Sequence, residues 1–310
     1  MTRPTAAPSP APASRARVRA ALVSIQVLFG INYLASKILV TEIGAPAWAS
    51  LRTLAAFVVV ALIVFAARRP LPARRDMGLL AVASIFGIVL NQGLFLEGLA
   101  RTTVGRSALI CSQIPTFVLL FSVLGRQEPL TRRKAAGFVA GIAGVLVLLE
   151  ADRFAWDARH LAGDLLTLAN AASFALYVVL TRRIMARNDP LAATMVVFGA
   201  GAVGMFLYGG RALLATDLSR LDAGHLLIMA YVVLGATVAT YFLNLWAVKR
   251  VAATRVAIFI FLQPLIAATL GVVFRGEDLT GRFVLASALI FTALLLRDGT
   301  APTVRPRESA

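Results

Sequence analysis

The sequence predicts an all-α membrane protein with ten transmembrane helices, arranged as two inverted five-helix repeats. Three observations predict this class: the composition, an internal repeat and a series of ten apolar segments. Apolar residues make up 59% of the chain and charged residues only 15%, and the mean hydropathy is +0.82. Such a composition is typical of a membrane protein.

The internal repeat appears where a stretch starting at Ser107 aligns without a gap with a stretch starting at Val256. The aligned identical pairs include Arg106 and Arg255, Pro115 and Pro264, Glu128 and Glu277, Leu130 and Leu279, and Thr131 and Thr280. Each stretch holds two apolar segments joined by a short charged loop. A repeat changes the predicted fold of the whole chain, and this one indicates two copies of one membrane unit.

Ten apolar segments follow one another along the chain, each close to the roughly 20 residues that a helix needs to cross a bilayer. Their expected ranges are 18–40, 46–67, 77–99, 104–125, 134–150, 161–182, 190–214, 224–248, 253–274 and 281–297. Residues 1–17 are expected to form a disordered cytoplasmic tail, without a removable signal peptide. The expected units are a first repeat at 18–150, a second at 161–297 and a cytoplasmic tail at 298–310.

The orientation follows from the distribution of Arg and Lys between the two sets of loops. With the N-terminus inside, the cytoplasmic segments hold 21 basic residues and the outer loops hold 8. Both termini are therefore expected in the cytoplasm. Because five spans is an odd number, the second repeat enters the membrane from the opposite side. Inverted repeats are typical of secondary transporters, which bind their substrate near the middle of the membrane.

Several other kinds of site are not supported by the sequence. The net charge of +16 is spread over short loops, which indicates contact with anionic lipid headgroups and not with nucleic acid. Cys111 is the only cysteine, and His160 and His225 lack the spacing of a metal site. The chain has no phosphate-binding loop for ATP and no paired carboxylates or His–Asp arrangement, so no enzyme, cofactor or metal is predicted.

The motifs of the chain resemble a known family. They are FGINYLASK (Phe29–Lys37), PAWASLRTLAAF (Pro46–Phe57), the block from Ser112 to Leu148, GDLLTLANAASFALYVVLTRR (Gly163–Arg183) and QPLIAATLGVVFRGEDLTG from Gln263. Over about residues 20–297 the sequence resembles the drug/metabolite transporter superfamily, EamA type. One departure is Arg126-Gln127-Glu128, where a glycine–glutamate pair is usual; the second half keeps it as Gly276-Glu277.

The resemblance implies ten helices around a central cavity, lined mostly by helices 1, 3, 4, 6, 8 and 9, and the export of small metabolites. Its pattern is closest to amino-acid exporters. Arginine greatly outnumbers lysine and alanine is abundant, which indicates a GC-rich bacterial genome and therefore the bacterial inner membrane. The expected partners are a small-molecule substrate and membrane lipids. A coupling proton, and a monomer or a homodimer, are left open.

Two prolines at aligned positions, Pro115 and Pro264, are expected to interrupt helices 4 and 9. Each lacks an N–H, so the carbonyls of Cys111 and Ile260 lose their partners within the helix. In a bilayer those carbonyls have to face protein or a water-filled cavity. The paired positions favour a shared hinge, and the alternative is a packing kink.

Polar side chains recur at helical spacing inside the apolar segments. Because such groups normally face a bundle interior or water, they are expected to line a substrate cavity; the alternative is hydrogen bonding between helices. The expected lining is Gln26, Tyr33, Asn91, Gln92, Gln113, Asn170, Tyr177, Tyr241, Asn244 and Gln263. The two Gln-Pro regions are expected to face each other near mid-depth. The lining has no central charge and suits small neutral or zwitterionic molecules.

Four charged residues of the first half are expected to form an outer charge cluster: Lys37, Arg52, Glu97 and Arg106. Glu97 is expected to pair with one of the three cations and to close the outer end, and the alternative is proton coupling. The function predicted from all of this is a secondary transporter that exports small metabolites, amino acids favoured. The alternatives are a multidrug exporter of the same superfamily and a membrane receptor or scaffold without transport.

Overall fold

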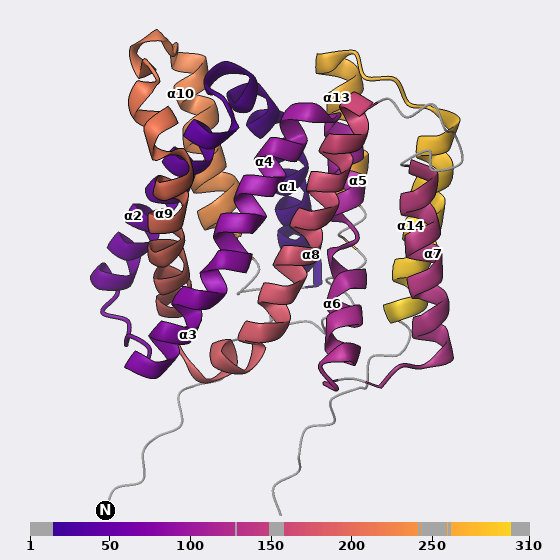
Figure 1. The fold of residues 1–310 in the computed structure, drawn as a ribbon, viewed down its shortest axis with the longest axis horizontal. Coiled ribbons are helices and arrows are strands. Elements are labelled where there is room, and N and C mark those ends of the chain that lie inside the picture. The colour runs from indigo at the N-terminus through magenta and orange to yellow at the C-terminus, as the bar shows by residue number, and fades with distance from the viewer. Residues whose placement is uncertain are drawn as a thin grey trace, which may run out of the picture.

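The computed structural model describes residues 15–127, 129–148, 158–240, 243, 259 and 262–298, and all regular structure among them is helical (Figure 1). The α-helices of the first half are α1 (Arg15–Ile43), α2 (Ala45–Ala66), α3 (Arg74–Ser84), α4 (Asn91–Arg101), α5 (Val104–Cys111), α6 (Ile114–Leu124) and α7 (Arg132–Leu148). The α-helices of the second half are α8 (Ala158–Arg187), α9 (Pro190–Ala215), α10 (Ala223–Ala230), α13 (Leu262–Arg275) and α14 (Gly281–Asp298). Two π-helical segments, η1 (Ile85–Leu90) and η3 (Tyr231–Ala239), and a short 3-10 turn, η2 (Leu218–Arg220), complete the elements.

Helical structure is present within each of the ten predicted segments. Of the described residues, six helices are long and apolar enough to cross a bilayer: Ala16–Ile43, Ala45–Ala66, Arg74–Arg101, Val104–Leu124, His160–Arg187 and Pro190–Ala215. The ten-span, two-repeat arrangement therefore remains part of the proposal made below. Of the predicted cytoplasmic tails, residues 1–14 and 299–310 lie outside the described residues, and α1 begins at Arg15 instead of near residue 18.

The helices pack in pairs that each join residues 15–148 to residues 158–298. α2 lies along α9, and α7 lies along α14 (Figure 1). α1 packs against α13, and α6 packs against α8. The buried apolar side chains form one main cluster that draws on α1, α2, α4, α5, α8 and α9. The core therefore lies between the two halves of the chain.

Small residues allow α2 and α9 to approach closely. A Cβ at Gly209 of α9 would collide with the carbonyl oxygen of Pro46. At the neighbouring interface, Gly201 lies against Ile88 and Gly204 against Val89. Close backbone approach through glycine is a common way to pack membrane helices, because lipid tails offer no hydrophobic drive between them.

The connection between α1 and α2 is a single residue, Gly44. Its φ is +81°, in the left-handed region where only glycine is unstrained. Pro46 follows in the first turn of α2, where the missing N–H has no helical partner to lose. This local sequence explains why the chain reverses here within one residue.

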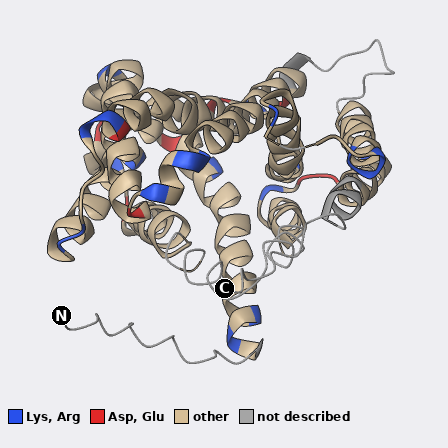
Figure 2. Ribbon diagram, turned by 90° about the horizontal axis from the view of Figure 1, so that it is seen from below, with Lys and Arg blue, Asp and Glu red and all other residues tan. Residues whose placement is uncertain are grey.

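One end of the bundle is rich in arginine and is called the basic end. It carries Arg68, Arg69, Arg74, Arg75, Arg182 and Arg183. Figure 2 views the bundle from this end, with blue segments on several helices. Here Asp76 of α3 accepts hydrogen bonds from Arg187 Nε of α8 (2.9 Å) and from Asn188 Nδ2 (2.7 Å). The opposite end holds the C-terminal ends of α1, α4 and α13 and the first residues of α2, α5 and α8.

The two π-helical segments lie at corresponding positions of the repeat. The register of the aligned prolines places residues 85–90 on residues 234–239, which lie inside η3. π-helical turns are rare and occur mainly at functional sites. In η1 the carbonyl of Phe86 accepts a hydrogen bond from Ser173 Oγ of α8 at 2.9 Å. In η3 Thr237 Oγ1 donates to the carbonyl of Val232 at 2.9 Å.

The predicted segment at 104–125 corresponds to Val104–Leu124 in the structure, and it is interrupted near Pro115. α5 ends at Cys111 and α6 begins at Ile114, with a turn at Ser112 and Gln113 between them. Pro115 lies in the first turn of α6, where its missing N–H requires no partner, so the chain is broken ahead of the proline and not kinked at it. Pro264 lies in the third position of the described α13, and Ile260 lies outside the described residues.

Candidate functional site

Four helices meet at a set of linked polar side chains, here called the polar chain: Gln92 and Asn91 of α4, Asn170 of α8, Cys111 of α5 and Tyr33 of α1. Gln92 Nε2 donates to Asn91 Oδ1 at 3.2 Å, and Asn170 Nδ2 donates to the Asn91 carbonyl at 2.7 Å. Cys111 Sγ donates to Asn170 Oδ1 at 3.5 Å, with Tyr33 next to Cys111. The Tyr33 ring meets Phe95 edge-on at 5.6 Å.

A second polar contact lies closer to the basic end. Gln263 Nε2 of α13 donates to Gln26 Oε1 of α1 at 2.6 Å. Gln26 precedes Tyr33 by two turns of α1, which is about 10 Å along the helix. The polar chain and the Gln26–Gln263 pair therefore lie at successive depths along α1, which is the helix that they share.

Two predicted cavity residues lie apart from these contacts. Gln113 sits in the turn between α5 and α6, with its Oε1 against Gly141 of α7. Tyr177 of α8 packs its ring on Gly87 of η1. Gln113 therefore contacts α7, whereas Gln263 contacts α1. The other two predicted residues, Tyr241 and Asn244, lie outside the described residues.

The opposite end carries a layer of charged and polar groups, two of them buried, here called the closure layer: Lys37, Thr102, Arg106, Asp164 and Glu277. Asp164 of α8 is fully buried and forms an ion pair with Arg106 of α5, whose Nε lies 2.9 Å from Asp164 Oδ2. Thr102 Oγ1 donates to Asp164 Oδ1 at 2.5 Å. Arg106 Nη2 also donates to the carbonyl of Leu148 at 2.6 Å, so one guanidinium joins α5, α7 and α8.

Lys37 and Glu277 satisfy helix ends in the same layer. Lys37 Nζ donates to the carbonyls of Leu99, Ala100 and Thr102 at 2.6, 3.1 and 2.9 Å, at the C-terminal end of α4. Glu277 accepts from the backbone N–H groups of Val104 (2.6 Å) and Gly105 (3.1 Å), at the N-terminus of α5. A cation at a helix C-terminus and an anion at an N-terminus are both favoured by the helix dipole.

The predicted outer charge cluster is wrong as a single cluster, because its four members bind different partners. Glu97 forms its ion pair with Arg101 of its own helix and accepts from Tyr208 Oη of α9 at 2.7 Å. It does not pair with Lys37, Arg52 or Arg106. The i, i+4 spacing makes Arg101 the nearest cation on the α4 surface. Arg52 of α2 is buried, and its Nη1 has no hydrogen-bond partner among the described residues.

Sequence reasoning missed Asp164 and the role of Glu277. Asp164 is an ionisable residue in an apolar helix, and such a residue normally marks a partner or a site, so the signal was present in GDLL. Its partner was not evident, since Arg106 lies 58 residues away. Within the described residues, no group of three or more His, Cys, Asp or Glu side chains could hold a metal ion.

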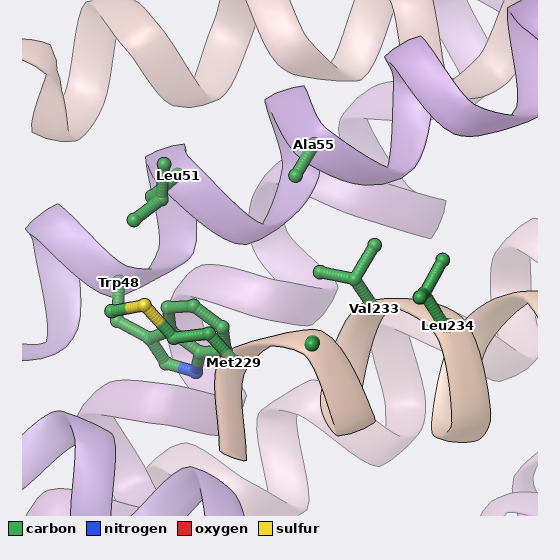
Figure 3. Close-up of a pocket in the computed structure, with 7 residues that line it drawn as sticks. Trp48, Leu51, Ala55, Met229, Val233 and Leu234 are labelled. Carbon is green, nitrogen blue, oxygen red and sulfur yellow. The ribbon is translucent and has the colours of Figure 1, made fainter. Parts of the chain in front are cut away.

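An apolar groove lies between α2 and the α10–η3 segment and is called the side groove. Figure 3 shows Leu51 and Ala55 on one helix facing Met229, Val233 and Leu234 on the other, with the Trp48 ring beside Met229. The groove encloses about 250 Å³ and is lined by Trp48, Leu51, Ala55, Met229, Ala230, Val233 and Leu234. The Trp48 side chain is fully buried, and its indole Nε1 has no hydrogen-bond partner among the described residues.

Apolar helices that pack with polar groups buried between them are typical of an integral membrane protein. The model of the EamA-like transporter family matches residues 20–150 and 161–297. The chain therefore belongs to the EamA-like transporter family, which confirms the resemblance seen in its motifs.

Curated relatives agree with the family at low identity. The chain is 26% identical over 287 residues to a "Probable amino-acid metabolite efflux pump" of Salmonella typhimurium, covering 88% of this chain and 91% of the relative. It is 22% identical over 279 residues to an "Uncharacterized transporter" of Archaeoglobus fulgidus, covering 89% and 96%. A solved structure, "Crystal structure of protein", shares the fold with a TM-score of 0.59 at 21% identity, covering 91% of this chain and 96% of that chain.

Proposed function

We propose that the protein is a secondary transporter that exports small neutral or zwitterionic metabolites, amino acids favoured, from the cytoplasm by alternating access. The polar chain is the observation that carries the proposal. It places amide, thiol and phenol groups from α1, α4, α5 and α8 in contact inside an apolar bundle. Donors and acceptors without a net charge suit an uncharged or zwitterionic ligand.

The proposal includes the ten-helix arrangement in two inverted repeats. It is supported by the two family matches and by the pairs α2–α9 and α7–α14. The π-helical segments at corresponding positions also support it. With the basic end in the cytoplasm, the closure layer lies at the outer end of the bundle.

Alternating access is supported by the different depths of the Arg106–Asp164 ion pair and the polar chain. The Arg106–Asp164 ion pair lies nearer the outer end than the polar chain, since Asp164 precedes Asn170 on α8 by about 9 Å of helix. A solute that approaches from outside would have to separate this buried pair. The described conformation thus closes the outer end, and outward release requires the closure layer to open.

Transport into proteoliposomes tests the proposal. Purified protein is reconstituted and a panel of labelled amino acids is tested for counterflow, with empty liposomes as the baseline. Asn170→Ala and Gln263→Ala should lower the transport rate about tenfold or more, because each removes a side-chain hydrogen bond between helices. Thr269→Ala is the matched control, because Thr269 is exposed on α13 and bonds only within its own helix.

The result that would overturn the proposal is equally definite. If no amino acid of the panel exchanges above the empty-liposome baseline, the substrate class is wrong. If exchange is seen but Asn170→Ala and Gln263→Ala both match Thr269→Ala, neither the polar chain nor the Gln26–Gln263 pair lies on the transport path. Monodisperse elution of each variant in detergent shows that the loss is not due to misfolding.

A further inference from the structure

Arg52 is a buried cation without a counter-charge among the residues that the structure describes. Its residue is 8% exposed, and neither an acceptor for Nη1 nor an ion-pair partner is found among the described residues. The other membrane-embedded cations differ, since Arg106 faces Asp164 and Lys37 faces three carbonyls. A charge at this depth is unfavourable unless it is paired. Arg52 therefore points to an anionic partner that the described residues do not supply.

Trp48 lies one turn before Arg52, and its indole Nε1 also has no hydrogen-bond partner among the described residues. Both side chains are donors, both are buried, and both lack a partner. Residues four apart on a helix lie one above the other on the same side. A carboxylate has two oxygens and can accept from two such donors at once, with the guanidinium providing a charge-assisted bond.

Of these two donors, Trp48 lines the side groove and Arg52 does not. Trp48, Leu51 and Ala55 line it from α2, and Arg52 occupies the adjoining position on the same helix. The corresponding interface of the other half, between α9 and η1, is instead filled: Gly201 lies against Ile88 there and Gly204 against Val89. The repeat therefore does not by itself produce a groove, because the equivalent interface of the other half is filled.

We infer that Arg52 and Trp48 bind the carboxylate of the transported molecule and that the side groove takes its apolar group. The inference rests on the proposed transport function and narrows its substrate class to zwitterionic amino acids that bear one large aliphatic or aromatic group. The volume of about 250 Å³ is below the roughly 300–1,000 Å³ of pockets for drug-sized ligands. Arg52 and Trp48 are accordingly specificity-determining residues.

Trp48 provides a direct readout of binding. Replacing Trp156 and Trp246 by Phe leaves Trp48 as the only tryptophan of the chain. In this background L-leucine and 4-methylpentanoate should change the Trp48 emission in a saturable way, whereas 4-methylpentanamide should not. The acid and its amide have the same apolar group, so the comparison isolates the carboxylate.

Substitution of Arg52 gives the second readout. Arg52→Gln should weaken L-leucine binding about tenfold or more, because it removes the charge and the forked donor. Arg52→Lys should give an intermediate loss, since it keeps the charge but not the fork. Arg220→Gln is the matched control, because the Arg220 side chain is 83% exposed in the η2 turn.

The outcomes separate this inference from the transport function. If acid and amide bind equally to the single-tryptophan protein, the carboxylate site is overturned even if Arg52→Gln fails to fold. If wild-type protein exchanges L-leucine and folded Arg52→Gln exchanges it at the same rate, the inference fails while the transport function stands. If the acid binds through Trp48 but no labelled amino acid is exchanged, the binding site stands and the transport function fails.

Discussion

Arg106 of α5 and Asp164 of α8 form an ion pair that joins the two halves of the chain, at the end of the bundle opposite the basic end. The carboxylate side chain is fully buried and the guanidinium side chain is 20% exposed. Both carry further bonds, to Leu148 and Thr102 respectively. These further bonds occupy hydrogen-bonding atoms of Arg106 and Asp164 that the ion pair itself leaves without a partner.

Asp164→Ala should lower the free energy of unfolding by about 3–5 kcal/mol, because it leaves the Arg106 guanidinium without its counter-charge. Denaturant unfolding in detergent micelles measures the change. Asp217→Ala is the control: its ion pair with Arg220 is exposed on both sides, so the substitution should change the stability far less. The double variant Arg106→Met, Asp164→Leu should recover most of the loss. Equal effects of the two Ala substitutions would show that burial does not matter here.

Glu97 is expected to be structural, although its partners are Arg101 and Tyr208 and not the three cations first expected. Tyr208→Phe removes the hydrogen bond between α9 and α4 and should cost about 0.5–1.5 kcal/mol of stability. Glu97→Gln should leave the pH dependence of transport unchanged, measured as exchange rate against pH in proteoliposomes. A flat pH profile in Glu97→Gln beside a sloped wild-type profile would assign Glu97 to proton coupling instead.

The proposed orientation can be measured with single cysteines in a Cys111→Ala background. Ala158→Cys, at the first residue of α8, should react with a membrane-impermeant maleimide in cells whose outer membrane is permeabilised. Ala73→Cys, just before α3 at the basic end, should react only after the inner membrane is opened. The reverse pattern would invert the topology.

Two glycines provide a matched test of helix packing. Gly209→Ala places a methyl group against the carbonyl of Pro46 and should destabilise the protein by about 1–3 kcal/mol. Gly78→Ala places the same methyl group in open space on α3 and should be neutral or stabilise by up to about 1 kcal/mol, because glycine weakens a helix interior. The midpoint of thermal unfolding, measured for both variants in the same detergent, tests the two predictions. Similar midpoints for the two would rule out tight α2–α9 packing.

The sequence was sufficient to predict the helical class, the family and the helix positions, because apolar runs of bilayer length are a strong local signal. Helical spacing also placed Tyr33, Asn91 and Asn170 inside the bundle, where the structure buries them, whereas their role in lining a substrate cavity stays a prediction. Helical periodicity assigns a residue to a face of its own helix, and this is why it succeeded for these residues.

Periodicity does not say which residue of another helix a side chain meets. The partners of Arg106 and Glu97 depend on helix packing between residues 58 and 111 positions apart. The break at Ser112 and Gln113 lies ahead of Pro115, a shift that the proline alone does not specify. Lys37 and Glu277 bind backbone groups at helix ends, and every helix end offers such groups, so the sequence does not single these out.

The π-helical segment η1 holds one residue that its helix can lose. A π turn holds about one residue more than an α turn. A single-residue deletion within η1 would therefore close the segment as an α turn, with Asn91 still beside Asn170 and Glu97 still beside Tyr208. The same deletion within α4, which has no extra residue in its turns, would rotate the residues beyond it by about 100°. The tolerance of this helix to a change of length is thus confined to η1.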